Sequence, residues 1–559
     1  MSITADGEKA ISARFDDGQS VKNGEGTSSQ EDAGHSLQRN LHSRHVTMIA
    51  LGGALGTGLL VGTGSTLVKA GPASILIDYS IVGFAVFLVM SAMGEVISFM
   101  PLAHGFGGYA SRLVDPALGF ATGYTYFFSF LVAVPNQIAA FALIMKFWVG
   151  ESVSPAVFIT VAIVSIVIIN SVGVKAFGEF EFWLSALKVI ILIGLILLLL
   201  ILAAGGGPTG DRPGFRYWSD PGAFAAYRVE GATGRLLGLW SAMITAVYAF
   251  TGTELVGVTV GETQNARLAM PKAIKLTFYR ILFFYVTSVF LLGLVVPYNS
   301  PELAFATTHK TSAAASPFVV AIKLAKIKWL DHIINGCLVV FVFSAANSDL
   351  YIAARTLYGI SVDGKAPEVL SRTTKNGVPY VSVGFCGLFC SLAYMSISAG
   401  SQTTFQYLSN VVSVFAILAW VSILVTHIFF CHAIKAQRID SAYIPYRAPF
   451  GVMGSYVAVT FFAILALTQG INSFVLEFDY RGFIVTYIGI PLYLGCILGF
   501  KYTRKTKRVR ACSADLVTGV PTETVKEERG RVEAARRETE SAATRRYAKF
   551  YNTMIYWLF

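Results

Sequence analysis

Charged residues are scarce in this 559-residue sequence: Asp, Glu, Lys and Arg together make up 14% of it, while 54% of the residues are hydrophobic. Soluble globular domains carry about 25% charged residues. The apolar side chains exceed what one soluble core can bury, so the composition excludes an ordinary soluble protein. We expect an integral membrane protein.

Motifs of enzyme chemistry are also missing. The sequence shows no nucleophile with a neighbouring base, no cluster of metal ligands and no phosphate-binding loop, so we expect no catalytic residue, metal or cofactor. Its six cysteines form no paired framework. Cys386 and Cys390 are four residues apart but have no His or carboxylate near them in the sequence, and we expect the cysteines to be reduced packing residues.

Long apolar runs, in contrast, are abundant. A bilayer-spanning helix needs about 20 mostly apolar residues. Runs such as LKVIILIGLILLLLIL are continuous, whereas the strands of a membrane barrel alternate with a period of two residues. The sequence therefore predicts an all-α integral membrane protein with about twelve transmembrane helices, at residues 46–68, 73–100, 118–148, 155–174, 180–204, 236–262, 273–297, 331–361, 379–399, 405–433, 448–473 and 482–502.

Lys and Arg residues in the short loops set the orientation, because cytosolic loops carry an excess of them. They follow the sixth, eighth, tenth and twelfth spans, so both termini are expected in the cytosol. Residues 1–45 are then a polar, disordered tail without a cleavable signal peptide, residues 46–503 the membrane domain, and residues 504–559 a tail with an amphipathic helix. The net charge of +11 reflects this sidedness, and we expect contact with the lipid bilayer but no nucleic-acid partner.

Glycines interrupt the first and the sixth span. Six of the fifteen residues from Ala50 to Gly64 are glycine, which either lets neighbouring helices pack closely or marks an unwound helix. The sixth span reads AVYAFTGTELVGVTVGE and places Glu254 at mid-membrane, where a carboxylate costs about 2.5–3.5 kcal/mol. Paired interruptions in equivalent positions predict an inverted-repeat transporter with its substrate between them. Free N–H and carbonyl groups at such helix ends suit a zwitterion, for example an amino acid.

Several blocks carry a more specific resemblance. In chain order they are RHVTMIALGGALGTGLLVGTG, AGPASILIDYSIVG, MGEVISFMP, AFTGTELVGVTVGET followed by MPKAIK, and VFSAANSDLYIAARTLYG. They resemble the fungal amino acid permeases of the amino acid-polyamine-organocation superfamily over about residues 44–504. The resemblance implies a LeuT-like five-plus-five inverted repeat with two additional C-terminal helices, and amino acid import with protons at the plasma membrane. It implies a substrate site at Gly56, Thr57, Gly58, Phe250, Thr251, Gly252 and Thr253, beside Glu254.

The fifth span is a candidate for proton coupling. Glu181, Ser185 and Lys188 are spaced by four and three residues and therefore share one helical face. Lys188 either points to the cytosolic interface, as long basic side chains often do, or is buried and exchanges a proton. The resemblance favours the second alternative, because sodium-independent relatives have a lysine where sodium-coupled members hold an ion. We therefore assign proton coupling to Lys188 and Glu181.

The third span contains Asn136 and Gln137 at mid-depth, next to Pro135. The two amides either bond to neighbouring helices, worth about 0.6–2 kcal/mol each, or contact the substrate. Many fungal amino acid permeases have glutamate at the position of Gln137, and a neutral amide there avoids repulsion of an acidic substrate. The PNQ block, with MPKAIKLTFYRILFFY and SAANSDLYIA, most resembles the dicarboxylic amino acid permeases. We expect glutamate and aspartate as substrates; a neutral amino acid permease and an amino acid receptor are the alternatives.

The eighth span adds Asn347 as a further candidate for the substrate site. Arg355 lies nearer the cytosolic end and is interpreted as an anchor, with Asp349 or a neighbouring helix as its partner. Ser409 in the tenth span is a weaker candidate. In the N-terminal tail, Lys9 and Lys22 are accessible and, by analogy with regulated permeases, are candidates for ubiquitin attachment by a ubiquitin ligase.

Overall fold

The structure is a computed structural model that describes residues 55–102, 105–150, 152–258, 266–303, 316–399 and 401–518, with a few isolated positions besides. The predicted N-terminal tail with Lys9 and Lys22, and most of the predicted C-terminal amphipathic helix, lie outside the described residues. The described part is built from helices, as the long continuous apolar runs predict.

The described residues of the first half of the membrane domain form seven helical elements. A π-helical turn, η3, continues directly into α3, and a short helix, α5, connects the long helices α4 and α6. The bounds are η3 Gly58–Gly62, α3 Thr63–Ala70, α4 Pro72–Phe99, α5 Gly105–Leu113, α6 Pro116–Val149, α7 Pro155–Val172 and α8 Val174–Ala203.

The second half repeats this order of elements with more breaks, and two further spans follow it. The bounds are α9 Gly231–Phe250, α10 Leu255–Val258, α11 Ala266–Arg280, η6 Ile281–Val286, α12 Thr287–Val295, α14 Pro317–Leu324, α15 Leu330–Val362, α16 Tyr380–Phe389, η8 Cys390–Tyr394, α17 Met395–Ala399, α18 Ser401–Ala436, α19 Gly451–Thr468, α20 Tyr480–Tyr487 and α21 Gly489–Arg504.

Ten described helices are long and apolar enough to cross a membrane. The pair α20 and α21, bent by 41°, would form an eleventh span. The first predicted span, at residues 46–68, is described mainly from Leu55 onward. The predicted number of twelve helices is consistent with this arrangement.

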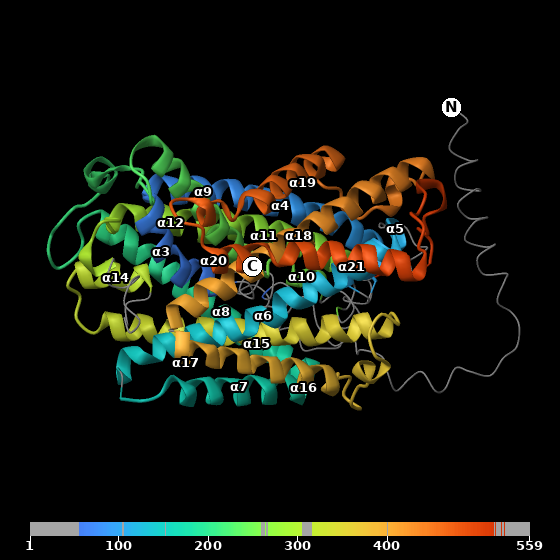
Figure 1. The fold of residues 1–559 in the computed structure, drawn as a ribbon, viewed down its shortest axis with the longest axis horizontal. Helices are drawn as coiled ribbons and strands as arrows, with labels where there is room; N and C mark the ends of the chain where they lie inside the picture. The colour runs from blue at the N-terminus through green and yellow to red at the C-terminus, as the bar shows by residue number, and fades with distance from the viewer. Residues whose placement is uncertain are drawn as a thin grey trace, which may run out of the picture.

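The two halves have the same order of elements but opposite orientations along the long axis of the molecule. A short helix lies between the second and third spans of each half, α5 between α4 and α6 and α14 between α12 and α15. These two short helices lie near opposite ends of the long axis of the molecule (Figure 1). The fold is thus the predicted LeuT-like inverted repeat. Helices α6 and α15 pack along each other at its centre, and α18 packs against α6.

Proline and a side-chain cap mark the start of several spans. Pro72, Pro116 and Pro155 are the first residues of α4, α6 and α7, where the missing N–H is not needed for helical bonding. Asp115 caps α6 by accepting a hydrogen bond from the N–H of Ala117 at 2.9 Å. Pro116 and the Asp115 cap therefore fix where α6 begins, and α6 carries Asn136 and Gln137.

The described residues that follow α21 fold back over one end of the bundle. The N–H of Val509 donates to the carbonyl of Val114, and Arg112 of α5 forms an ion pair with Asp515 at 2.9 Å. Gln437, just after α18, donates to the carbonyls of Ala511 and Ala514. This segment therefore joins α5 to the end of α18.

Candidate functional site

The sixth predicted span is interrupted between α9 and α10, where the sequence predicts it. Thr251 has an extended backbone with ψ 139°, and Gly252 has φ +91°, a conformation that favours glycine. Glu254 lies inside the interruption and is 1% exposed. Its carboxylate accepts hydrogen bonds from the N–H of Gly252 (3.4 Å) and from the hydroxyl of Thr253 (3.3 Å). The carboxyl group that the sequence places at mid-membrane is therefore hydrogen-bonded by the interrupted helix itself.

The first predicted span begins to be described at its own irregular point. Leu55 and Gly56 are not helical, and the π turn η3 starts two residues later. A Cβ on Gly58 would lie 2.3 Å from the Cα of Ala249, so this glycine allows the backbones of η3 and α9 to touch. A Cβ on Gly56 would lie 3.3 Å from the Cβ of Ala345 of α15 and 3.4 Å from the side-chain nitrogen of Gln137. Gly58 is thus packed against the backbone of α9, whereas Gly56 lies beside the side chains of α15 and of Gln137.

A network of buried hydrogen bonds connects four spans next to these interruptions. The hydroxyl of Thr57 donates to Oε1 of Gln137 at 2.8 Å and is 2.8 Å from the hydroxyl of Tyr248. Asn136 donates through Nδ2 to Tyr248 at 2.8 Å and to the hydroxyl of Ser409 at 2.9 Å. Thr57, Asn136 and Gln137, all predicted site residues, therefore meet at one place. Tyr248 joins them and was not predicted, since an aromatic residue in a span is usually a packing residue.

The eighth span contributes a different residue from the predicted one. Nε2 of Gln137 donates to Oδ2 of Asp349 on α15 at 3.2 Å. Asn347, the predicted candidate, accepts a hydrogen bond from Asn170 of α7 at 2.9 Å. The carboxylate of Asp349 therefore belongs to the network, whereas the oxygen of the Asn347 amide binds α7.

Phe250 is a packing residue rather than part of a cavity wall. Its side chain is fully buried, and its ring stacks on Tyr285 of η6 at 4.5 Å between centroids and lies 5.9 Å from the ring of Tyr79 of α4. The hydroxyl of Tyr79 reaches the carbonyl of Gly58 at 3.5 Å. These rings pack the end of α9 against α4 and η6, and the side chain of Phe250 thereby stabilises the residues next to the interruption.

A cavity of about 190 Å³, which we call the Tyr248 cavity, leads to this network. Tyr248 and Ser409 line its inner part, and Lys69, Arg228 and Asp479 also line it. Lys69 lies over the ring of Tyr227 at 5.6 Å, and Arg228 donates to the carbonyl of Asn472 at 2.5 Å. Two cationic side chains and one carboxylate thus give the wall a net positive charge.

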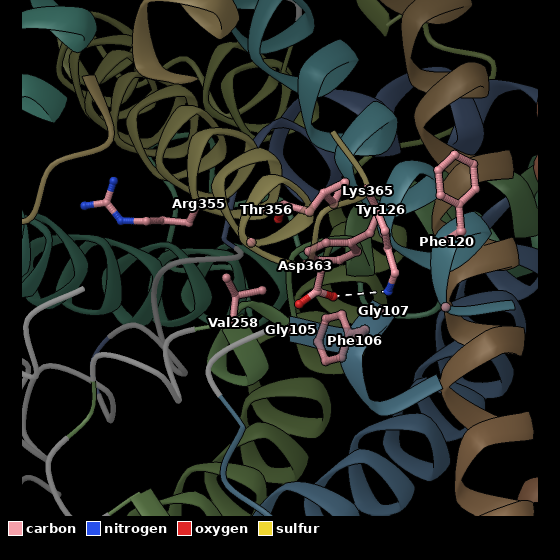
Figure 2. Close-up of a pocket in the computed structure, with 14 residues that line it drawn as sticks. Gly105, Phe106, Gly107, Phe120, Tyr126, Val258, Arg355, Thr356, Asp363 and Lys365 are labelled. Carbon is pink, nitrogen blue, oxygen red and sulfur yellow. Dashed lines mark hydrogen bonds and ion pairs between the residues drawn. The ribbon is translucent and has the colours of Figure 1, made fainter. Parts of the chain in front are cut away.

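A second cavity, the Arg355 cavity, lies between α5, α6 and α15 and has about 30 Å³, little more than the space of one water molecule (Figure 2). Lys365 bridges its lining with hydrogen bonds to Asp363 (3.1 Å) and to the hydroxyl of Ser111 (2.7 Å). Arg355 points away from this pair, and its guanidinium lies over the ring of Tyr351 at 4.6 Å. Asp349, one of the partners considered for Arg355, accepts a hydrogen bond from Gln137.

The predicted polar face of the fifth span is buried against α15. Nζ of Lys188 lies 3.5 Å from Oε1 of Glu181, and both side chains are 0% exposed. Ser185 donates to Glu181 at 3.2 Å, and Ser344 of α15 lies 3.0 Å from both carboxylate oxygens. The alternative in which Lys188 extends to the interface is therefore wrong. A buried ion pair occupies the position instead.

The family and the relatives of this chain are membrane permeases rather than enzymes. The amino acid permease family model matches residues 45–511, and the chain belongs to this family. It is 48% identical to the dicarboxylic amino acid permease of Saccharomyces cerevisiae over 91% of this chain and 84% of that protein, and 37% identical to the basic amino-acid permease of the same organism over 85% and 82%. A manganese transporter variant from Eremococcus coleocola shares the fold alone, with a TM-score of 0.52 at 12% identity over 83% of this chain and 94% of that one.

Proposed function

We propose that this permease imports acidic amino acids, glutamate and aspartate, together with protons across the plasma membrane by alternating access. The observation that carries the proposal is the Tyr248 cavity, which joins a net positive lining to the buried network of Thr57, Asn136 and Gln137. The similarity to a dicarboxylic amino acid permease supports the same substrates.

Gln137 supports acidic selectivity through its charge. Its amide lies between Thr57 and Asp349, donating to the carboxylate and accepting from the hydroxyl. A glutamate at this position would place a second carboxylate about 3 Å from Asp349 and would repel the side chain of an acidic substrate. Because Gln137 is a neutral amide, Asp349 is the only acidic residue among Thr57, Gln137 and Asp349.

Sidedness follows from the basic loops. Lys and Arg are enriched in α11, which follows the sixth span, and in the loops after α15 and α18, and this enrichment supports a cytosolic location for that end of the bundle. The Arg355 cavity borders Asp363 and Lys365 at the end of α15 and therefore faces the cytosol, whereas the Tyr248 cavity faces outward. Both termini are cytosolic in this arrangement. Lys9 and Lys22 would then be accessible to a ubiquitin ligase, which mass spectrometry of the purified transporter would test.

The buried pair of Glu181 and Lys188 is the proposed proton-coupling element. If one member of a buried ion pair loses its charge, the charge of the other is left uncompensated. The protonation of Glu181 or Lys188 must therefore change together with the surroundings of the pair. Alternating access changes these surroundings. A proton taken up on one side could then be released on the other.

Selectivity is tested by uptake of labelled glutamate into proteoliposomes under an imposed proton gradient. Unlabelled aspartate should compete and leucine should not. Gln137→Glu should reduce uptake of glutamate by about 10-fold or more, because each 1.4 kcal/mol of repulsion is worth a factor of ten. Gln406→Glu is the matched control: it adds the same charge to the Tyr248 cavity away from Asp349 and should have a smaller effect. Equal competition by leucine would contradict acidic selectivity, and saturable binding without accumulation would contradict transport.

Coupling is tested separately with Lys188→Ala. Accumulation driven by the proton gradient should be lost, while exchange of internal for external glutamate should be less affected. Lys435→Ala removes an exposed lysine from the last turn of α18 and should leave both activities unchanged. Undiminished accumulation in Lys188→Ala would exclude a proton role for this residue.

A further inference from the structure

Three metal-ligating side chains meet away from the transport network, where α4 and α18 approach their ends. Glu95 lies in the last turns of α4, and His427 and Cys431 are one turn apart on α18. The sequence does not predict this cluster, because Glu95 is 332 residues away from His427 along the chain and only the fold brings them together.

The spacing of the three ligand atoms matches that around a small metal ion. Nε2 of His427 lies 3.1 Å from Oε2 of Glu95 and 3.4 Å from Sγ of Cys431, and the ligand atoms all lie within 4.8 Å of one another. A tetrahedral ion with bonds of about 2.0–2.3 Å holds its ligand atoms roughly 3.3–3.7 Å apart. The three side chains therefore need only small shifts to bind one ion.

Neighbouring groups orient two of these ligands. Nδ1 of His427 lies 2.8 Å from the hydroxyl of Ser455 on α19, so a proton on Nδ1 can be donated to Ser455 while Nε2 keeps its lone pair. Oε2 of Glu95 also accepts a hydrogen bond from the N–H of Ala448 at 2.8 Å. A second nitrogen bonded to protein and a carboxylate fixed by a donor are usual around bound metals.

We propose that Glu95, His427 and Cys431 form a binding site for Zn²⁺ or an ion of similar chemistry. One thiolate, one imidazole and one carboxylate are ligands that zinc accepts, whereas Mg²⁺ and Ca²⁺ prefer oxygen alone. His427 is fully buried and Glu95 nearly so, while Cys431 is half-buried and offers a path of entry. A bound ion would join α4 to α18 at the end of the molecule proposed to be cytosolic.

The test uses the full-length protein, purified without a polyhistidine tag and stripped with a chelator. Co²⁺ is titrated and the thiolate-to-cobalt charge-transfer absorption is followed, after which Zn²⁺ is added. We expect one Co²⁺ per chain, displacement by Zn²⁺, and a rise in the thermal unfolding temperature with Zn²⁺. Cys431→Ser should abolish the absorption band and His427→Gln should weaken binding at least 10-fold. Ser455→Ala should weaken it about 10-fold, as loss of an orienting partner does.

Cys496→Ser is the matched control, because Cys496 is also half-buried but lies on α21. It should leave the titration unchanged. An absent absorption band, a band that survives in Cys431→Ser, or equal loss in Cys496→Ser would overturn the proposal. If Cys431→Ser does not fold, His427→Gln with the thermal measurement decides the matter. Because binding is measured without uptake, failure here is distinguishable from failure of the proposed transport function.

Discussion

The Tyr248 cavity and the Arg355 cavity lie on either side of the interruption in the sixth span, yet they differ widely in volume, about 190 Å³ against about 30 Å³. Tyr248, before the interruption, lines the larger one, and Val258, after it, lines the smaller one. Two members of the hydrogen-bond network, Tyr248 and Ser409, thus line the larger cavity, and neither of them lines the smaller one. The proposed alternating access requires such a difference between the two sides of the protein in any one conformation.

Contact between backbones closes the smaller side. A Cβ on Gly119 of α6 would lie 1.8 Å from the hydroxyl oxygen of Ser111 and 2.4 Å from the carbonyl oxygen of Gly107, both of α5, so glycine is needed for this close approach of the two helices. Lys365 adds hydrogen bonds from the end of α15 to Ser111 of α5. The comparison indicates that α5 must move off α6 before the Arg355 cavity can widen.

The largest expected effect concerns the backbone contact between η3 and α9. Gly58→Ala places a methyl group against the Cα of Ala249 and should cost about 1–3 kcal/mol or more in packing, with glutamate uptake lost. Gly194→Ala is the control, since a Cβ there meets no atom within 4 Å. The measurement is uptake together with the thermal unfolding temperature. Normal uptake by Gly58→Ala would show that η3 and α9 need not touch.

The next effect concerns the inner end of the Tyr248 cavity. Tyr248→Phe removes the hydroxyl that contacts Thr57 and Asn136, and leaving buried partners unsatisfied costs about 1–3 kcal/mol. The KM for glutamate should rise about 5- to 100-fold. Tyr407→Phe removes a hydroxyl from another residue lining the same cavity and should change KM much less. Equal effects of the two variants would mean that the network does not contact substrate.

A smaller effect is expected at the closed side. Lys365→Ala removes the contacts to Ser111 and Asp363, worth about 0.5–1 kcal/mol, and should widen the Arg355 cavity in a larger fraction of molecules. With Thr356→Cys as a reporter in the lining, labelling by a membrane-impermeant maleimide should become about 2- to 5-fold faster. Lys507→Ala, on an exposed lysine, serves as the control. Unchanged labelling would show that Lys365 does not help to close this side.

The smallest effect is an acid dependence at the start of α6. Burial alone would raise the pKa of Asp115, but hydrogen bonds from Lys501 (2.8 Å), Ala117 and Thr506 outweigh it and hold this pKa below its usual value. A lowered pKa contributes stability above the unfolded pKa near 4, and this contribution is lost as pH falls through the folded pKa. Asp115→Asn should lower the unfolding temperature by about 1–2 °C at pH 7.

The difference between parent and Asp115→Asn should shrink in acid, at pH values below about 4. Lys501→Ala should give a similar loss at pH 7 that does not add to that of Asp115→Asn, because both variants remove the same contact. A difference that stays constant with pH, or losses that add, would exclude the ion pair as the cause.

The broad architecture and the broken sixth span could be predicted from sequence. Apolar runs of bilayer length predict the spans, and glycine beside a mid-membrane carboxylate predicts the interruption at Gly252 and Glu254. The partners within the site could not be predicted this way. Tyr248 meets Thr57 across 191 residues, and no local spacing reports such a contact.

Residues two positions apart in the sequence also proved to have different surroundings. Gly56 and Gly58 are two positions apart, but one lies beside Gln137 and the other touches the backbone of α9. Asn347 and Asp349 are likewise two apart on α15, and only Asp349 bonds to Gln137. Which of two neighbouring residues faces the site depends on the rotation of each helix, and polar residues on several faces of α15 left that rotation undetermined.

Glu181 and Lys188 belong to the same helix, so a tilt of α8 as a rigid body leaves their separation unchanged. Ser344 is carried by α15, and sliding of one helix past the other would withdraw its hydroxyl from the carboxylate. After such sliding, the carboxylate of Glu181 would lack the hydrogen bond that Ser344 donates to it. A proton on the Glu181 carboxylate would replace the lost donor, so under the proposed coupling helix sliding and proton uptake would have a common cause.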